Sequence, residues 1–569
     1  MGEESSLEYR IASLVHSHFN ALPKRSKPAI HPNGIREWIP LSGIVLVIGE
    51  GTPEETLTCV AIATGAKCLS SSQIPQCRGL VLHDSHAEIL AIRAFNRWLL
   101  EECKSTLLYE AEVDWQQRAQ DQVSHDVTAS DSNPTGGTGS GTRSQFVQLR
   151  LADEEVAHTA IGGDTDAPPM ARHRKLLWPP FKLREDLKIW MYCTCAPCGD
   201  ASMELCMAAQ DDPTPWAVPP SSTECTESGG DPAGSLLDGR GYFSILGVVR
   251  RKPSRADAES TLSKSCSDKL AAKQVTSLLS FTTSLLVAPT SNAYISRLLL
   301  PEEEVSQAGC ERAFGSGTTG RLKPLNGQTW DDTSVGGVEY GFRPFEIRTL
   351  SARLTEELWM FGKPKDTRIK SKPGNAAAIW TAQQSVLSTS TTKLSNAHNS
   401  LQGNLCETII NGTKQGHKFA SPSPRKASAV SRAKMWDLLR DIVKLLPTIS
   451  TCEDPGETST SANKFETEIG GSDDSAASSD LLFLDKLKQI IAISSTYEAL
   501  KENAADAGLS SIRNRALSDL RNMLGNWVRN IGDEGWGLGV LKEEVVKKPH
   551  PRSLKVPQAV PASLANPGI

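Results

Sequence analysis

One stretch constrains this chain more than any other: residues 82–100, which read LHDSHAEILAIRAFNRWLL. Its apolar residues recur at helical spacing, so the stretch predicts an amphipathic helix packed against a core. His86 and Glu88 stand at the start of that helix. Ser85 and Glu88 match a capping box, in which the carboxylate only closes the helix start. Alternatively, the His–x–Glu pair is half of a zinc deaminase site, in which the imidazole binds the metal and the carboxylate moves protons.

Size and charge leave the class of partner open. With 569 residues, the chain is long enough to bury a large core. The net charge of −5 and the pI of about 6.2 give no global signal for a nucleic-acid partner, so RNA would have to bind through a local basic patch.

The thirteen cysteines fit an intracellular protein whose thiols are reduced and free to bind metal. The first residues, MGEESSLEYRIASLV, are acidic and do not resemble a secretory signal. No stretch has the apolar length of a membrane span. We therefore expect a soluble protein of the nucleus or cytoplasm.

Hydrophobic patterning predicts strands and helices in alternation, interrupted by polar segments. Strands are expected at 43–48, 57–62, 187–192 and 242–249, and helices at 5–22, 201–210, from 270 onward, and at 433–446, 481–492 and 496–524. Disordered insertions are expected near 113–168, 213–232, 385–421 and 452–479, followed by a disordered tail at 547–569. We interpret 1–546 as a single domain.

The rest of a metal site has to come from cysteines. The usual deaminase pattern continues with P-C-x-x-C, but here Pro197-Cys198 is followed by Ala201 where the second cysteine should stand. Cys195 and Cys198 form a C-x-x-C pair in the opposite sense, which leaves a structural zinc half-site or a redox pair as alternatives. Cys198 and Cys266 each precede a predicted helix, where free backbone N–H groups favour the thiolate. A cysteine in such a setting can also be a small buried residue.

Three blocks together resemble a known family. HAE at 86–88, PCGDAS at 197–202 and SCSDK at 265–269 are similar to the RNA adenosine deaminase family, whose third zinc ligand is the cysteine of SCSDK. The resemblance implies an α/β fold: a cytidine-deaminase-like three-layer α/β/α core with a helical C-terminal extension. Within the family the chain is most similar to the tRNA-specific branch in its fungal form, on the stretches GIREW from Gly34, RRKPSRAD from Arg250 and SCSDKLAAKQ from Ser265.

The resemblance also implies roles for individual residues. His86, Cys198 and Cys266 would hold Zn²⁺, and Glu88 would take a proton from the attacking water and deliver protons to the purine and to the departing ammonia. Residues expected near RNA are Lys67, Arg250, Arg255 and Asp257, with Lys252 as an alternative member of an interior relay that includes Asp84. Asp257 stands where the double-stranded-RNA enzymes have a glutamate.

Family members enclose inositol hexakisphosphate, which requires buried cations and aromatic donors. Matching positions here are Arg93, Lys269, Arg432, Tyr497, Lys501 and Trp527. Two departures stand against a full match, because Ile92 and Ala272 occupy positions where the double-stranded-RNA enzymes have arginines. The alternative is that these charges form ordinary surface ion pairs.

The expected function is deamination of adenosine to inosine in tRNA, at adenosine 37 of alanine tRNA. Two alternatives remain at this point: the same chemistry on double-stranded RNA, and a non-catalytic RNA-binding subunit. The sequence shows no separate RNA-binding module and is silent on the oligomeric state.

Overall fold

A mixed sheet of eight strands forms the centre of the molecule. The computed structural model describes residues 3–125, 144–151, 176–209, 237–238, 245–252, 259–332, 338–364, 368–385, 404–416, 422–447, 474–527 and 529–542. In spatial order the strands are β14 (Glu346–Leu350), β11 (Ile295–Pro301), β8 (Leu187–Cys193), β2 (Leu41–Ile48), β3 (Thr56–Thr64), β16 (Ala377–Thr381), β17 (Cys406–Ile410) and β18 (Thr413–Lys414). The first three run parallel to one another, and every other neighbouring pair is antiparallel.

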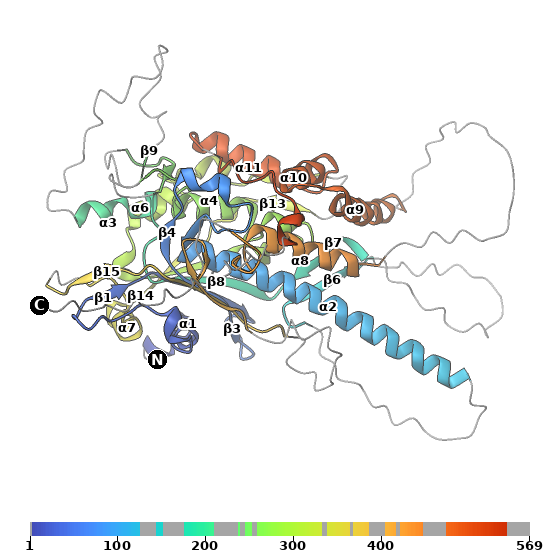
Figure 1. Cartoon of the computed structure of the whole chain (residues 1–569), viewed down its shortest axis with the longest axis horizontal. Coiled ribbons are helices and arrows are strands. Elements are labelled where there is room, and N and C mark those ends of the chain that lie inside the picture. Colours follow the sequence, from blue (N-terminus) through green and yellow to red (C-terminus); the bar gives the residue numbers. More distant parts are fainter. Residues whose placement is uncertain are drawn as a thin grey trace, which may run out of the picture.

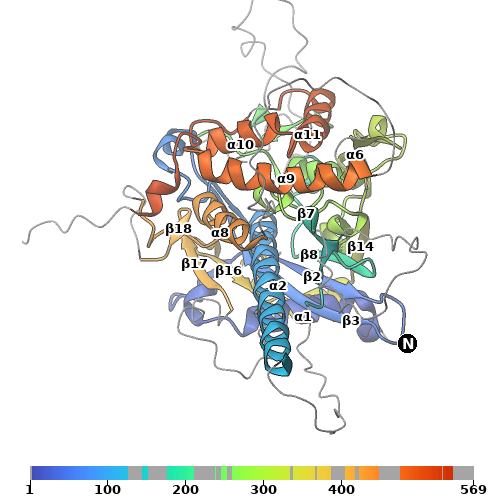
Figure 2. The ribbon, with the colours of Figure 1, turned by 90° about the vertical axis from the view of Figure 1, so that its right-hand side faces the viewer.

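Helices surround this sheet and continue beyond it. They are α1 (Leu7–Asn20), α2 (Ala87–His125), α3 (Met203–Ala208), α4 (Cys266–Thr276), α5 (Phe281–Ser284), α6 (Gln307–Phe314), α7 (Ala352–Leu358), α8 (Arg432–Leu445), α9 (Asp474–Ile493), α10 (Tyr497–Asp506) and α11 (Ser511–Leu524). In Figure 1, α1 and α7 lie below the sheet and α9 to α11 lie above it. Figure 2 shows α8 beside α2, with α9, α10 and α11 stacked over them.

The sheet is buried on both faces, as a three-layer fold requires. Ile44 and Leu46 of β2 belong to the apolar cluster under α2, whereas Val45 and Val47 belong to the cluster under α1. Successive strand residues point to opposite faces, so β2 reads as one continuous apolar run with no polar face. The expected α/β fold with a helical C-terminal region is confirmed.

Two-stranded sheets hold the loops around this core. The pairs are β4 (Ala66–Cys68) with β5 (Asp84–His86), β1 (Arg36–Trp38) with β15 (Ser371–Pro373), β6 (Val147–Leu151) with β7 (Leu176–Leu183), β9 (Leu237–Asp238) with β10 (Arg250–Arg251), and β12 (Thr329–Asp331) with β13 (Glu339–Gly341). The β4–β5 pair ends at His86 and leads directly into α2.

Three predicted elements differ from the structure. The helix expected from 270 begins at Cys266, because Ser265 caps it by accepting a hydrogen bond from the Asp268 amide. The helix expected over 496–524 is two helices, separated by a turn in which Gly508 has a φ of +85°. In the strand expected at 242–249, the described residues 245–249 carry no strand.

The expected insertions are only partly right. Residues 113–125 continue α2, 147–151 form β6, and 404–416 contain β17 and β18, because these segments pair or continue existing elements. Residues 474–479 belong to α9. Residues 144–146 and 385 are described but belong to no helix or strand. The other parts of these insertions, including all of 213–232, and the tail at 547–569 lie outside the described residues. Among the helices that are described, none has the length and apolarity needed to cross a membrane.

Candidate metal centre

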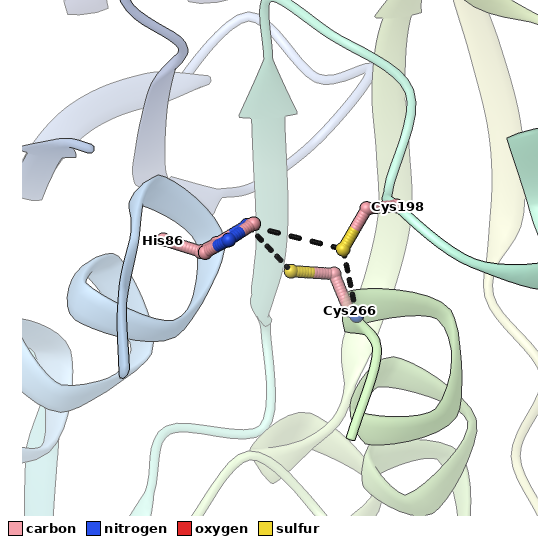
Figure 3. A group of neighbouring side chains, drawn as sticks. All are labelled: His86, Cys198 and Cys266. Carbon is pink, nitrogen blue, oxygen red and sulfur yellow. Dashed lines mark hydrogen bonds between the residues drawn. The ribbon is translucent and has the colours of Figure 1, made fainter. Parts of the chain in front are cut away.

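Three side chains from distant parts of the chain converge at one end of the sheet. His86 ends β5, Cys198 lies in the loop after β8, and Cys266 is the first residue of α4. The His86 Nδ1 atom is 3.8 Å from the Cys198 Sγ atom and 3.6 Å from the Cys266 Sγ atom. Figure 3 shows the ring and both sulfurs directed at a common point. All three potential ligand atoms lie within 4.8 Å of one another.

These distances suit a tetrahedral ion. Zinc–sulfur bonds of about 2.3 Å and zinc–nitrogen bonds of about 2.0 Å place neighbouring ligand atoms roughly 3.5 Å apart. The observed separations of 3.6 Å and 3.8 Å agree with this geometry. One nitrogen and two sulfurs leave a fourth position open, which is the arrangement of a catalytic zinc site and not of a structural one.

Two glycines allow the loops to approach so closely. Gly65 has a φ of +147°, and a Cβ atom there would lie 2.0 Å from the Ser85 carbonyl oxygen. The carbonyl of Gly65 accepts a hydrogen bond from the amide of Ala87, so this contact fixes the start of α2. Gly199 has a φ of +104°, and a Cβ atom there would lie 2.3 Å from the Ser265 hydroxyl. A side chain at Gly199 would therefore push the Cys198 loop away from α4.

Hydrogen bonds and nearby cations favour a thiolate at Cys198. The contact with Cys266 and the positive charges of Lys252 and His86 lower the pKa of Cys198 well below its ordinary value, although burial opposes them. The backbone amide of Cys266 also donates to the Cys198 sulfur, at 3.4 Å. Burial opposes a charged imidazole at His86, yet the adjacent Cys198 thiolate raises the pKa of that ring to about 10. The charged His86 ring and Lys252 thus balance the Cys198 thiolate, whereas burial and the neighbouring Cys198 raise the pKa of Cys266 well above its ordinary value.

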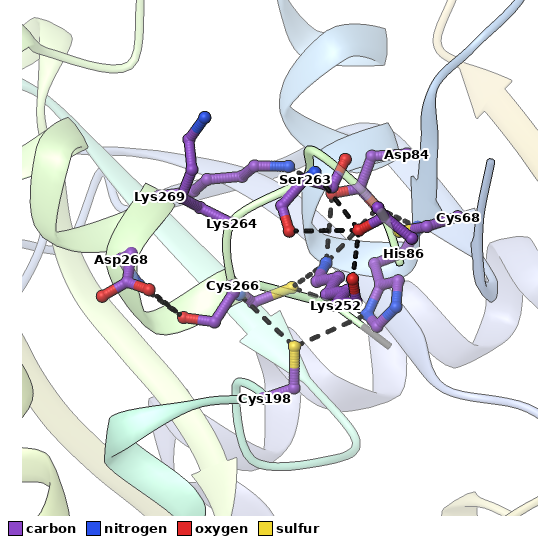
Figure 4. Close-up of polar contacts among 12 residues, drawn as sticks. Cys68, Asp84, His86, Cys198, Lys252, Ser263, Lys264, Cys266, Asp268 and Lys269 are labelled. Atoms are coloured by element: carbon purple, nitrogen blue, oxygen red, sulfur yellow. Dashed lines mark hydrogen bonds and ion pairs between the residues drawn. The ribbon is translucent and has the colours of Figure 1, made fainter. Parts of the chain in front are cut away.

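A buried ion-pair network supports the ligands from behind. The Lys252 ammonium lies 3.1 Å from the nearer carboxylate oxygen of Asp84 and 3.2 Å from the Cys266 sulfur, and Lys269 also bonds to Asp84. Figure 4 shows this network beside the His86 ring. Burial opposes ionisation of Asp84, but the two ammonium groups hold its pKa well below the usual range. Asp84 and Lys252 therefore lie together at the site, as their predicted membership of one relay requires.

Glu88 is buried next to the ligands. Its side chain is 5% exposed, and burial raises the pKa of its carboxyl, with His86 opposing the shift. Helix α2 begins at Ala87, so Glu88 is its second residue and not the third, which a capping box would require. A carboxyl whose pKa is raised toward neutrality suits a group that both accepts and returns a proton.

Other cysteine groups are less suited to a metal. Cys68, Asp84 and His86 form a second compact group, but the two lysines already neutralise Asp84. Cys195, which was expected in a strand, lies in the loop beyond β8, and burial raises the pKa of its thiol. Among the described residues, the compact groups of possible metal ligands do not include Cys195.

A third compact group fixes a helix. Cys77, His83 and Asp533 lie within 4.8 Å of one another. The Arg432 guanidinium occupies this group, since it donates to Asp533 Oδ2 at 2.8 Å and lies 3.0 Å from His83 Nε2. A cation already fills the position that a metal would need. The group therefore ties α8 to the loop before β5 and to the C-terminal segment.

The residues expected at the RNA have different environments. Lys67 is exposed in β4, one strand from His86. Arg250 is 1% exposed, and its guanidinium donates to the Ile245 carbonyl, so its burial argues against a contact with RNA phosphates. Lys252 is 4% exposed and belongs to the interior network. Arg255 and Asp257 lie outside the described residues.

A second site lies between α2, α4, α8 and α11. It is a cavity of about 320 Å³, and five of the six residues expected to bind an inositol phosphate line it: Arg93, Lys269, Arg432, Tyr497 and Trp527. Lys501 stands behind Tyr497, with its ammonium 5.1 Å from the centre of that ring. Ile92 and Ala272, the two departures from the family pattern, also line the cavity.

Three further cations line the same cavity and were missed from the sequence: Lys273, Arg513 and Arg521. None of the described residues that line it is acidic. The buried Nε atoms of Arg513 and Arg521 have no hydrogen-bond partner among the described residues. Burial and the neighbouring Arg513 and Arg93 lower the pKa of Lys273 to about 7. The one available signal was helical spacing, because Lys269 and Lys273 are four residues apart and share a face of α4.

Comparison with known proteins gives consistent matches. The family model of the adenosine-deaminase (editase) domain matches residues 61–124 and 173–530. The tRNA-specific adenosine deaminase 1 of Schizosaccharomyces pombe is 30% identical over 448 residues, covering 78% of this chain and 88% of that protein. Proteins of the same name are 29% identical over 281 residues in Saccharomyces cerevisiae (49% of this chain, 55% of that protein) and 26% identical over 504 residues in Mus musculus (78% and 89%).

Proposed function

Because this chain belongs to the adenosine-deaminase (editase) family, we propose that it is a zinc-dependent enzyme that converts adenosine 37 of alanine tRNA to inosine. The family and the similarity to tRNA-specific deaminases make it a deaminase that acts on adenosine in tRNA. The observation that carries the finer proposal is the convergence of His86, Cys198 and Cys266 beside the buried Glu88.

The donor set fits zinc, since one imidazole nitrogen and two thiolates form an incomplete tetrahedron. When bound there, Zn²⁺ supplies a Lewis acid that brings the pKa of water toward neutrality. Glu88 would then take a proton from the attacking water and pass it to ring N1, and would next pass the hydroxyl proton of the C6 adduct to the departing ammonia. Lys252 holds the Cys266 sulfur in place through their 3.2 Å contact and offsets its charge.

Replacing Glu88 with Gln tests the proton-transfer role. The variant keeps the metal ligands, so zinc content stays at that of the wild type while inosine formation falls by at least about a thousandfold, as expected when a general acid–base is lost. Glu102→Gln is a matched control, because Glu102 is also buried in α2 and burial also raises its pKa, yet it bonds to Ser144 and Ser385. Normal turnover by Glu88→Gln would remove Glu88 from the mechanism.

Transcripts of alanine tRNA test the substrate. Sequencing should find inosine at position 37 with the wild type, and none in a transcript in which that adenosine is replaced. A perfect RNA duplex should remain unmodified at the same enzyme concentration. Modification of the duplex alone would favour the double-stranded-RNA alternative, and absence of inosine from both would favour a non-catalytic RNA-binding protein.

The cationic cavity supports inositol hexakisphosphate as a second bound group. Six lysines and arginines face it without an acid among the described lining residues, and two buried guanidinium N–H groups there find no hydrogen-bond partner in the described parts of the chain. Unpaired buried charge is costly, so a polyanion that accepts these hydrogen bonds would stabilise the fold. Acid extracts of the purified protein should contain inositol hexakisphosphate in about a 1:1 ratio to chain. Extracts without any inositol phosphate would contradict this assignment.

A further inference from the structure

A basic surface projects from the side of the molecule that carries the zinc ligands. It is built on the parallel pair of β1 with β15, which brings residue 36 opposite residue 371. Figure 1 shows these two strands, β1 in blue and β15 in yellow, side by side at the left edge of the view. Three lysines define what we call the basic ridge: Lys363, Lys370 and Lys372.

The ridge is a local exception to the charge of the chain. The whole protein has a net charge of −5. All three ridge lysines are exposed, and Lys370 and Lys372, two residues apart on an extended segment, point to the same face. Glu37 is the one acid in the described parts of 24–38 and 359–376, and its carboxylate is 3.5 Å from the Lys372 ammonium. No acid lies within 4 Å of Lys363 or Lys370 among the described residues.

The ridge reaches both loops that carry metal ligands. Beyond Lys372 the chain enters Gly374 and Asn375, which line a small pocket together with Gly65, Lys67 and Ser85. The carbonyl of Gly65 accepts a hydrogen bond from the amide of Ala87, the residue immediately after His86. At the other end, the Ile39 amide donates to the carbonyl of Phe361, two residues before Lys363. Leu41, two residues after Ile39, donates to the hydroxyl of Thr194 in the loop that leads to Cys198.

We propose that the basic ridge binds the phosphate backbone of the RNA substrate and holds the target nucleotide over the metal centre. This inference rests on the proposed function, because it assigns a binding surface to the same RNA substrate. These exposed lysines, of which Lys372 alone has an acidic partner among the described residues, include two on one face of an extended segment, and such an arrangement fits a chain of phosphates spaced along a strand. Phosphate contacts position RNA without reading its sequence, so the ridge contributes affinity and register but no base preference.

The triple variant Lys363→Ala, Lys370→Ala and Lys372→Ala tests the ridge. The wild type and the variant are titrated with alanine tRNA at several salt concentrations, and kcat and KM for inosine formation are measured. We expect the Kd and KM to rise on the order of tenfold to a hundredfold while kcat at saturating tRNA stays within about twofold. The slope of log K against log salt should fall by roughly 2, because each lost phosphate contact contributes about 0.7 to 0.9.

A charge-matched control removes three exposed lysines elsewhere: Lys188→Ala, Lys323→Ala and Lys444→Ala. Lys188 is suitable because it is the second residue of β8, whose opposite end leads to the Cys198 loop. The control should bind tRNA as the wild type does. If the ridge variant matched the control in Kd and salt slope while the wild type made inosine, the ridge proposal would be overturned and the surface left to a protein partner. If the wild type itself made no inosine in any tRNA, the proposed function would fail instead.

Discussion

The metal centre and the cationic cavity share one residue, Lys269, yet they treat charge in opposite ways. At the metal centre, the Cys198 thiolate and the carboxylate of Asp84 lie beside His86, Lys252 and Lys269, so the negative charges have positive partners. In the cavity, six cations face one another with no acid among the described lining residues, and only Lys269 and Arg432 have acidic partners outside that lining in the described parts of the chain. The charges of the metal centre are therefore paired before any ion binds, whereas the cations of the cavity repel one another until an anion binds. Removing the bound group should therefore affect chemistry at the first site and stability at the second.

The largest expected effect comes from a metal ligand. Cys266→Ala removes one of three donors and leaves Lys252 without the sulfur that it contacts at 3.2 Å. Zinc per chain should fall close to zero, and inosine formation should become undetectable, a loss of at least about a thousandfold. Plasma mass spectrometry and an inosine assay on the same sample measure both quantities.

The matched control is Cys103→Ala, another fully buried cysteine, which lies in α2 away from the ligands. It should retain zinc and activity and lose only the small stability associated with its packing. If Cys266→Ala kept a full complement of zinc, the three-ligand arrangement would be wrong. The contrast between a metal-binding site and an anion-binding cavity would then no longer hold.

The cavity should show the reverse pattern. Arg513→Ala removes a guanidinium whose buried Nε has no partner among the described residues. Because charge-assisted hydrogen bonds contribute about 1.5–3 kcal/mol, the affinity for inositol hexakisphosphate should fall about tenfold to a hundredfold, with zinc unchanged. The rise in Tm on adding the polyanion should shrink accordingly. Differential scanning fluorimetry with and without ligand measures this change.

Arg515→Ala provides the control, since Arg515 lies on the same helix but is exposed. It should respond to the polyanion as the wild type does. An equal Tm rise in all three proteins would show that the cavity does not bind the anion. The two sites would then differ only in the charged residues that they contain, and not in the kind of group that they bind.

The two sites also differ in how far the sequence predicted them. His86, Cys198, Cys266 and Glu88 stand in short motifs whose spacing is itself the signal, and the structure brings the ligands together. Five of six expected cavity residues line the cavity, but Lys273, Arg513 and Arg521 were missed. No short motif carries them, because a polyanion site is defined by which helix faces meet in space. Arg250 was misplaced for a related reason: a run of basic residues does not show which of them the fold buries.

The elements of the fold differ in the same way: some were predictable from local sequence patterns, and others depend on contacts between distant residues or on one backbone conformation. Strands β2, β3 and β8 were predicted because a sheet buried on both faces produces long apolar runs. The pairing of β1 with β15 could not be predicted, since each strand has three residues and they lie far apart in the chain. The break between α10 and α11 depends on the left-handed conformation of Gly508, and helical periodicity on both sides concealed it.

The smallest expected effect is the uptake of at most about one proton on binding, and it tests directly whether the cations of the empty cavity repel one another. Burial, Arg513 and Arg93 lower the pKa of Lys273 to about 7, against about 10.4 in an unfolded chain. Between these values the unfolded state binds more protons, so the contribution of Lys273 to the free energy of unfolding rises with pH in the empty cavity. A bound polyanion favours the ammonium form, so binding near pH 8 should draw up to about one proton onto Lys273.

Calorimetric titration of inositol hexakisphosphate at pH 8, in buffers of different ionisation enthalpy, measures this uptake. The phosphates also titrate, so the informative quantity is the difference between the wild type and Lys273→Met, which lacks the titrating group. The wild type should take up more protons than Lys273→Met, and its affinity should weaken more steeply from pH 7 to pH 9. Identical proton uptake would mean that Lys273 is already charged in the empty cavity. The cavity would then tolerate its cations through solvent, as an exposed surface does, and the contrast with the charge-paired metal centre would not hold.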